Sequence, residues 1–110
     1  MDDRPPAPER PRRSSFPLLD TLGELCLKGR DAAAYLWQVP NDAGVRTQLI
    51  NTIASIREEC AKAGRREMGV IAAELEVAIA ASPSPQQVEI LQDGFDRMTK
   101  LWQAAKSGLT

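Results

Sequence analysis

Apolar residues recur at alternating steps of three and four from residue 18 onward, and this spacing restricts the folds open to the chain. Residues so spaced lie on one face of an α-helix, whereas a half-buried strand requires strict alternation, of which there is no sign. Four such stripes occur: Leu18, Leu22, Leu25, Cys26, Ala33, Leu36 and Trp37; Val45, Leu49, Ile53, Ile56, Cys60 and Ala63; Met68, Ile71, Leu75 and Ile79; and Val88, Leu91, Phe95, Met98, Trp102 and Ala105. Segments of this kind joined by short linkers bury their stripes by packing together. The sequence therefore predicts an all-α fold, an antiparallel four-helix bundle.

Turn and capping residues separate the four segments. The first ends at residues 39–42, where Asn41 or Asp42 is available as the N-cap of the second. Gly64 marks the end of the second helix, and the third is expected over residues 66–81. Ser84 then suits an N-cap, with Pro85 in the first helical position and Gln87 placed for a capping box.

Two features of these segments leave the helix packing open. Gly29 lies in the middle of the first segment, which is either one long helix with a weak point there or two short helices. Val70 and Val77 form a second stripe on the third helix, which predicts that this helix is covered on two sides. The residues expected in the core are Leu49, Ile53, Ile56, Leu75, Leu91, Phe95 and Met98. Trp37 and Trp102 lie on apolar stripes, and core packing is favoured for both.

The N-terminal segment differs in composition from the rest. Residues 1–15 contain four prolines, which disfavour helix. The segment is also polar, so it has almost no apolar surface to bury. We expect a disordered tail over residues 1–15 and one helical bundle domain over residues 16–110.

The charge balance argues against two classes of partner. Fourteen basic and fifteen acidic residues give a formal net charge of -1. A nucleic-acid binder normally carries a basic excess on one face, and so does a protein that binds an anionic membrane. The segment before residue 16 also lacks an apolar leader, and no later run is apolar enough to cross a bilayer. The expectation is a cytoplasmic protein that binds neither nucleic acid nor membrane.

The chain offers few groups for catalysis or metal binding. It contains no histidine, so haem ligation by histidine, Glu-x-x-His di-iron sites and phosphoryl transfer through an imidazole are closed to it or must use weaker groups. Cys26 and Cys60 lack zinc-ligand spacing and are expected as buried free thiols. Glu89, Asp93 and Asp96 share one helix face, which is expected to be a solvated acidic surface rather than a cation site. We therefore expect no catalytic residue, no metal and no cofactor, and thus no enzyme.

Basic residues gather where the second helix ends. Lys62, Arg65 and Arg66 follow Arg57 there. Such a cluster complements the dipole of a helix C-terminus. It could also receive a carboxylate or an aspartyl-phosphate, but complementation of the dipole is the favoured interpretation.

One stretch of the chain resembles the histidine-containing phosphotransfer (HPt) domain. That family carries its phosphorylated histidine three residues before a lysine, which a glycine follows, with a second glycine seven residues beyond the lysine. Here the stretch Glu59-Cys60-Ala61-Lys62-Ala63-Gly64, followed by Gly69, keeps the lysine and the second glycine, places Glu59 at the histidine position and displaces the first glycine by one. A rival placement is Leu25-Cys26-Leu27-Lys28-Gly29, which lies earlier in the chain. The resemblance implies a module that keeps a docking surface for a response regulator and has lost the phosphoryl carrier.

These observations favour a non-catalytic helical protein-interaction module, in its HPt-like version an adaptor or regulator in bacterial two-component signalling. The expected partner is another protein, for which the resemblance implies a response regulator or a kinase. The expected partner-binding residues are Ser55, Glu58, Glu59, Lys62, Arg65 and Arg66. The alternatives are a helical oligomerisation domain, which would form a homo-oligomer, and a ligand-binding bundle whose site uses carboxylates and arginines.

Overall fold

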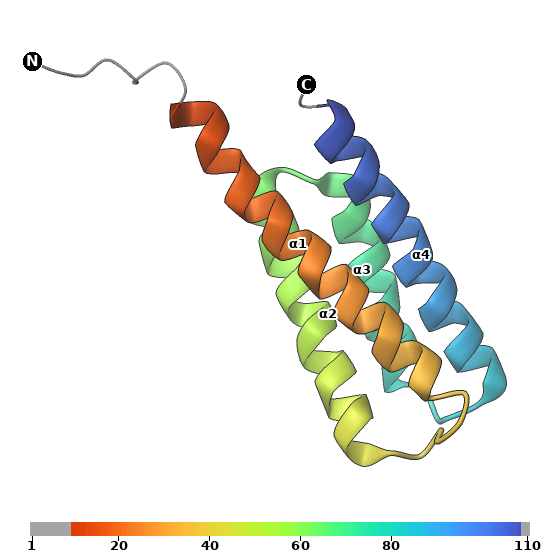
Figure 1. Cartoon of the computed structure of the whole chain (residues 1–110). Coiled ribbons are helices and arrows are strands. Elements are labelled where there is room, and N and C mark those ends of the chain that lie inside the picture. The colour runs from red at the N-terminus through yellow and green to blue at the C-terminus, as the bar shows by residue number, and fades with distance from the viewer. Residues whose placement is uncertain (1–9, 109–110) are drawn as a thin grey trace, which may run out of the picture.

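Four helices make up nearly all of the described chain. The structure is a computed structural model that describes residues 10–108, with side chains from Leu19 onward. Its helices are α1 (Arg10–Tyr35), α2 (Ala43–Ala63), α3 (Arg66–Ala80) and α4 (Pro85–Gly108). Each helix packs against two others, in the order α1, α2, α3, α4 and back to α1, and consecutive helices run antiparallel (Figure 1). The predicted all-α four-helix bundle is confirmed.

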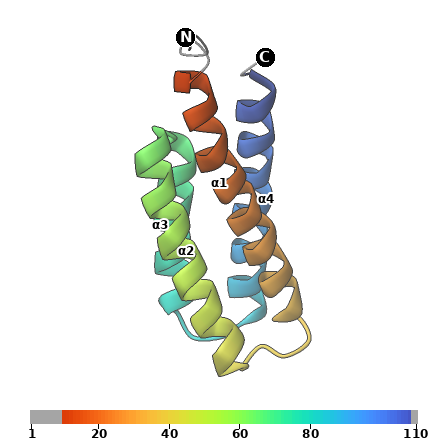
Figure 2. The ribbon, with the colours of Figure 1, turned by 60° about the vertical axis from the view of Figure 1, so that its left-hand side comes forward.

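One end of the bundle gathers three parts of the chain. The start of α1, the end of α4 and the α2–α3 connection all lie there, as Figure 2 shows. The other end holds the α1–α2 and α3–α4 connections. Residues at the α2–α3 connection therefore lie beside the last turns of α4.

The N-terminal boundary differs from the expectation. Residues 1–9 lie outside the described residues, so the predicted disorder of this segment stays a prediction. Residues 10–15, expected in the tail, instead form the first turns of α1. Pro11 is compatible with this start because the first four amides of a helix have no intrahelical acceptor, so a residue without an amide loses nothing there.

The core is continuous and apolar. All seven residues predicted to be buried are buried, and Phe95, at the centre of α4, has no exposed surface. The core consists of Leu19, Leu22, Cys26, Ala32, Ala33, Leu36, Leu49, Ile53, Ile56, Cys60, Met68, Ile71, Ala72, Leu75, Ile79, Val88, Leu91, Phe95 and Met98. All four helices contribute to it, so no helix can be removed without exposing the stripes of its neighbours.

Gly29 is a packing position within a continuous α1, and not a break. A Cβ atom added to it would lie 2.2 Å from Cε1 of Phe95 on α4. Gly23 has the same role, because a Cβ there would lie 2.2 Å from Cζ2 of Trp102. The two glycines let α1 approach the aromatic rings of α4 more closely than any other residue would allow.

The predicted caps of α2 are both present. The backbone amide of Val45 donates to Oδ1 of Asp42 at 3.0 Å, which identifies Asp42 as the N-cap. Gly64 follows the last helical residue with φ of 69°, the left-handed conformation that favours glycine at this position.

The α3–α4 junction uses its predicted cap only in part. The amide of Gln87 donates to Oγ of Ser84 at 3.0 Å, as an N-cap requires. The side chain of Gln87, however, is buried and donates to the carbonyls of Ala78 and Ala81 at 2.9 and 2.7 Å. Its Oε1 accepts from Nη1 of Arg46 at 2.8 Å. Gln87 therefore satisfies carbonyls at the end of α3 instead of closing a capping box.

The prediction that α3 is covered on two sides was wrong. Val70 and Val77 are 54% and 76% exposed. α3 packs only against α2 and α4, and both contacts lie on the side of α3 that faces the core. Nothing among the described residues covers its outer side.

Trp37 also lies outside the core. It is 45% exposed because α1 ends at Tyr35, so Trp37 no longer follows the helical stripe. Its indole Nε1 donates to Oε1 of Gln92 on α4. Trp102, by contrast, is half-buried, and its indole donates to the carbonyl of Leu19 on α1. Core packing was therefore the right expectation for Trp102 in part and the wrong one for Trp37.

Candidate docking surface

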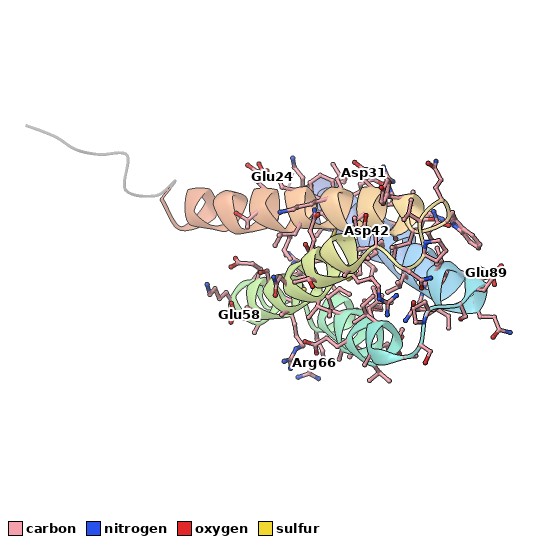
Figure 3. The ribbon with its side chains drawn as sticks, turned by 90° about the horizontal axis from the view of Figure 1, so that it is seen from below. Glu24, Asp31, Asp42, Glu58, Arg66 and Glu89 are labelled. Atoms are coloured by element: carbon pink, nitrogen blue, oxygen red, sulfur yellow. The ribbon has the colours of Figure 1, made fainter. Side chains whose placement is uncertain are left out.

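The charged side chains of the bundle spread over its surface and form no common site. Figure 3 shows Glu24 and Asp31 projecting from the α1 side, with Arg66 on the opposite side of the bundle. Glu58 and Glu89 point outward from α2 and α4, far from each other. Glu24, Asp31, Glu58 and Glu89, as labelled in Figure 3, therefore do not gather into one site.

The acidic residues of α4 do not form a metal centre. Oδ2 of Asp93 accepts from Nε of Arg97 at 3.0 Å, and Arg97 also lies 3.7 Å from Oε1 of Glu74. Over residues 10–108, no group of three or more acidic or cysteine side chains could hold a metal ion. The acidic side of α4 is therefore a solvated surface on which Asp93 is paired with Arg97.

Both cysteines are free thiols in buried positions, as the sequence predicts. Burial, with a smaller contribution from the nearby Cys60, raises the pKa of Cys26 from 9.0 to about 12. Burial, together with the charge of Glu59, raises the pKa of Cys60 from 9.0 to about 11. Neither thiol forms a nucleophilic thiolate at neutral pH.

The predicted partner-binding residues divide into two groups. The first group comes from the polar side of α2. Glu59 accepts from Nζ of Lys62 at 3.2 Å, and its side chain is only 17% exposed. Ser55, one turn earlier, lines a shallow hollow between α2 and α1. Glu58 is exposed on the same helix.

The second group, Arg65 and Arg66, lies at the α2–α3 connection. Both line an open hollow of about 530 Å³ between α2 and α3. They also line a hollow of about 560 Å³ between this connection and the last turns of α4, which Glu67 lines as well. This second hollow holds the mixture of arginine and carboxylate that the ligand-binding alternative expects, but it opens at the surface rather than inside the bundle.

A surface that the expected site did not include runs along the outer side of α2 and α3. We call it the α2–α3 outer face, and it consists of Ile50, Ala54, Ala61, Val70, Ala73, Val77 and Ala80, all of them exposed. One ion pair crosses it, from Nε of Arg57 to Oε1 of Glu76 at 2.9 Å. The sequence carried the signal for this face in the stripe of Val70 and Val77, which was interpreted as a second buried side.

Comparison of the chain with protein-family models, with curated proteins and with solved structures found no match. Within residues 10–108, no helix combines the length and the apolar character needed to cross a membrane. The surface geometry of the bundle is therefore the basis for a functional assignment.

Proposed function

We propose that this chain is a non-catalytic helical protein-interaction module that binds its partner on the α2–α3 outer face. The observation that carries the proposal is the exposure of Val70 and Val77 on α3 and of Ile50 on α2, beside a core that is already complete. Single exposed apolar residues are ordinary on protein surfaces. Seven exposed apolar residues on the outer sides of two packed helices are the kind of surface that interaction sites present.

The apolar character of the outer face also favours a role in binding over a role in catalysis. Association removes apolar area from water, and that burial drives most protein–protein binding. A catalytic role would instead need activated groups in a cleft. The thiols here are buried with raised pKa values, and the carboxylates are dispersed or paired.

Affinity capture from the cells that make the protein tests this proposal. Val77→Lys places a charge in the middle of the outer face without touching the core, and Ala34→Lys places the same charge on an exposed position of α1. We expect the parent and Ala34→Lys to retain the same identified partner, which then binds the purified parent directly. Val77→Lys should lose it by about tenfold or more in affinity, because a charge buried at an interface without a partner is costly.

Two results would contradict the proposal. One is equal capture by Val77→Lys and Ala34→Lys. The other is loss of the partner in both variants, which would place binding elsewhere. Melting curves of the two variants within a few degrees of the parent ensure that neither result comes from unfolding.

A second candidate is an HPt-like adaptor that docks a response-regulator receiver domain on the polar side of α2 instead of on the outer face. The pairing of Glu59 with Lys62 on the polar side of α2 supports it, because these residues occupy the histidine and lysine positions of the resemblance. In this version Lys62→Glu weakens binding to a purified receiver domain, and Val77→Lys does not. If neither variant changes binding to any of a panel of receiver domains, the HPt-like version is wrong.

A further inference from the structure

One end of the α2–α3 outer face forms a groove, which is lined by arginines as well as by apolar residues. The open hollow of about 530 Å³ lies between the last turns of α2 and the first turns of α3. Ala61, Gly69, Val70 and Ala73 supply small apolar side chains to it, or none. Such a lining leaves room for another helix to approach closely, as in the helix-in-groove mode of recognition.

Arginines line the same groove. We call Arg57, Arg65 and Arg66 the arginine rim, and all three line the hollow. Arg57 has a partner in Glu76. No such partner is seen for Arg66 within residues 10–108, so the rim carries a net positive charge over an apolar floor.

Arg65 lacks an acceptor in the bundle. Its Nε atom is buried and has no hydrogen-bond partner among the described residues. Arg65 is also the N-cap residue of α3, and its side chain makes no capping hydrogen bond. Within the described residues, no side chain at the N-cap accepts from the first amides of α3, and the one acidic residue of that turn is Glu67. Nε of Arg65 and these amides are donors, and a carboxylate is the protein group that accepts from arginine and helix N-terminal amides most strongly.

We infer that the groove between α2 and α3 binds an amphipathic helix of a partner protein, with the apolar side of that helix on Ala61, Gly69, Val70 and Ala73. Acidic residues on one side of that helix pair with the arginine rim, and one of their carboxylates binds beside Arg65 and Arg66. The inference rests on the proposed function, because it names the kind of segment that the α2–α3 outer face takes. Charge complementarity selects this occupant over a second copy of the chain, which would bring a second arginine-rich groove or a mixed surface.

The test uses the full chain, labelled with ¹⁵N, and three synthetic peptides. The first is a helical peptide with leucine at every third or fourth position and glutamate along one flank. The second replaces each glutamate by lysine, and the third scrambles the first so that its apolar stripe is lost. Amide shifts recorded during each titration give both the affinity and the location of binding.

The acidic peptide should shift the amides of Ala61, Gly69, Val70 and Ala73, and it should bind about tenfold or more tightly than the other two peptides. Arg66→Glu should weaken its binding by about tenfold, and so should Ala73→Gln, which fills the groove without changing the charge. The matched controls are Lys100→Glu, which reverses a charge at an exposed position of α4 outside the groove, and Ala34→Gln on α1. Both should bind within about twofold of the parent.

Three results would overturn the inference: equal binding of the acidic and basic peptides, shifts confined to another part of the bundle, and concentration-dependent shifts of the same four amides in the protein alone, which would assign the groove to a second copy. Failure of the inference is distinct from failure of the proposed function. If Val77→Lys still loses the captured partner while the acidic peptide does not bind, only the identity of the bound segment is wrong.

Discussion

Gly29 and Phe95 illustrate how single residues set the distance between helices. The ring of Phe95 occupies the space where a side chain at position 29 would be, and Trp102 does the same at Gly23. Glycine inside a helix costs about 1 kcal/mol relative to alanine. The burial of two large rings against α1 offsets this cost, since a buried aromatic side chain contributes several times as much.

Alanine substitutions at two helical glycines should therefore have opposite effects. Gly29→Ala should lower the free energy of unfolding by about 1 to 3 kcal/mol, because its Cβ overlaps the Phe95 ring. Gly69→Ala on α3 should raise it by about 0.5 to 1 kcal/mol, because a Cβ there would lie 3.6 Å from Cβ of Cys60, an ordinary contact. Urea unfolding of the two variants measures both changes. Stabilisation by Gly29→Ala would show that α1 and α4 are not so close.

The buried thiols predict a pH dependence of stability. Each thiol has a pKa raised by burial, to about 12 for Cys26 and about 11 for Cys60. Below pH 9 both are neutral in the folded and unfolded chains. Between pH 9 and the raised pKa of each folded thiol, the thiols ionise mainly in the unfolded chain, so the folded state loses up to about 1.4 kcal/mol of stability per pH unit for each thiol.

Unfolding at a series of pH values from 7 to 11 checks this effect. The double variant Cys26→Ala, Cys60→Ala should be less stable at pH 7 because of the lost packing, but its stability should fall less steeply above pH 9. Parallel profiles for the parent and the variant would mean that the thiols are exposed or already ionised in the folded protein.

Among the helices, α3 has a buried side, an exposed side and a C-terminal end whose carbonyls bind polar side chains. Its inner stripe of Met68, Ile71, Leu75 and Ile79 is buried, as the sequence predicts. Its outer stripe is exposed, because a bundle of four helices gives each helix only two neighbours. At its C-terminus, the side chains of Arg46 and Gln87 donate to the carbonyls of Ala78 and Ala81, at the end of the helix where intrahelical donors run out.

Removal of the Gln87 side chain should destabilise the α3–α4 junction. Gln87→Ala removes the side-chain donor to the carbonyls of Ala78 and Ala81 and the acceptor of Nη1 of Arg46, and the loss of these buried bonds should cost about 1 to 3 kcal/mol. Gln86→Ala, one residue earlier and exposed, should change stability by less than about 0.5 kcal/mol. Thermal unfolding of the pair gives the comparison, and equal melting temperatures would show that this network contributes nothing.

The whole molecule shows which of these features a sequence can predict. The number of helices, most of their boundaries and the buried stripes follow from spacing and capping residues such as Asp42 and Gly64, which act locally. The role of Gly29 does not, because it depends on a ring 66 positions away in the chain, 95 minus 29. Periodicity likewise cannot tell a covered stripe from an exposed one, so the stripe of Val70 and Val77 predicts a second covered side where the structure has an exposed face.

The partner-binding residues are the least predictable part. The spacing of Ser55, Glu58, Glu59 and Lys62 identifies a polar side of α2, but only Ser55 of these lines the hollow between α2 and α1. Arg65 and Arg66 lie apart from them, in the hollow between α2 and α3. The arginines join the apolar outer face only through the turn at Gly64. A surface built from two helices and their connection is a product of the tertiary arrangement.

The central claim is that another protein covers the α2–α3 outer face, and photo-crosslinking in the native cell tests it most directly. A photoreactive phenylalanine analogue replaces Val77 in one variant and Ala34 in a second, and the covalent products are identified by mass. The account predicts a product between the Val77 variant and one other protein, with little or none from the Ala34 variant. Products from both positions in equal amount, or products that contain only this chain, would contradict it.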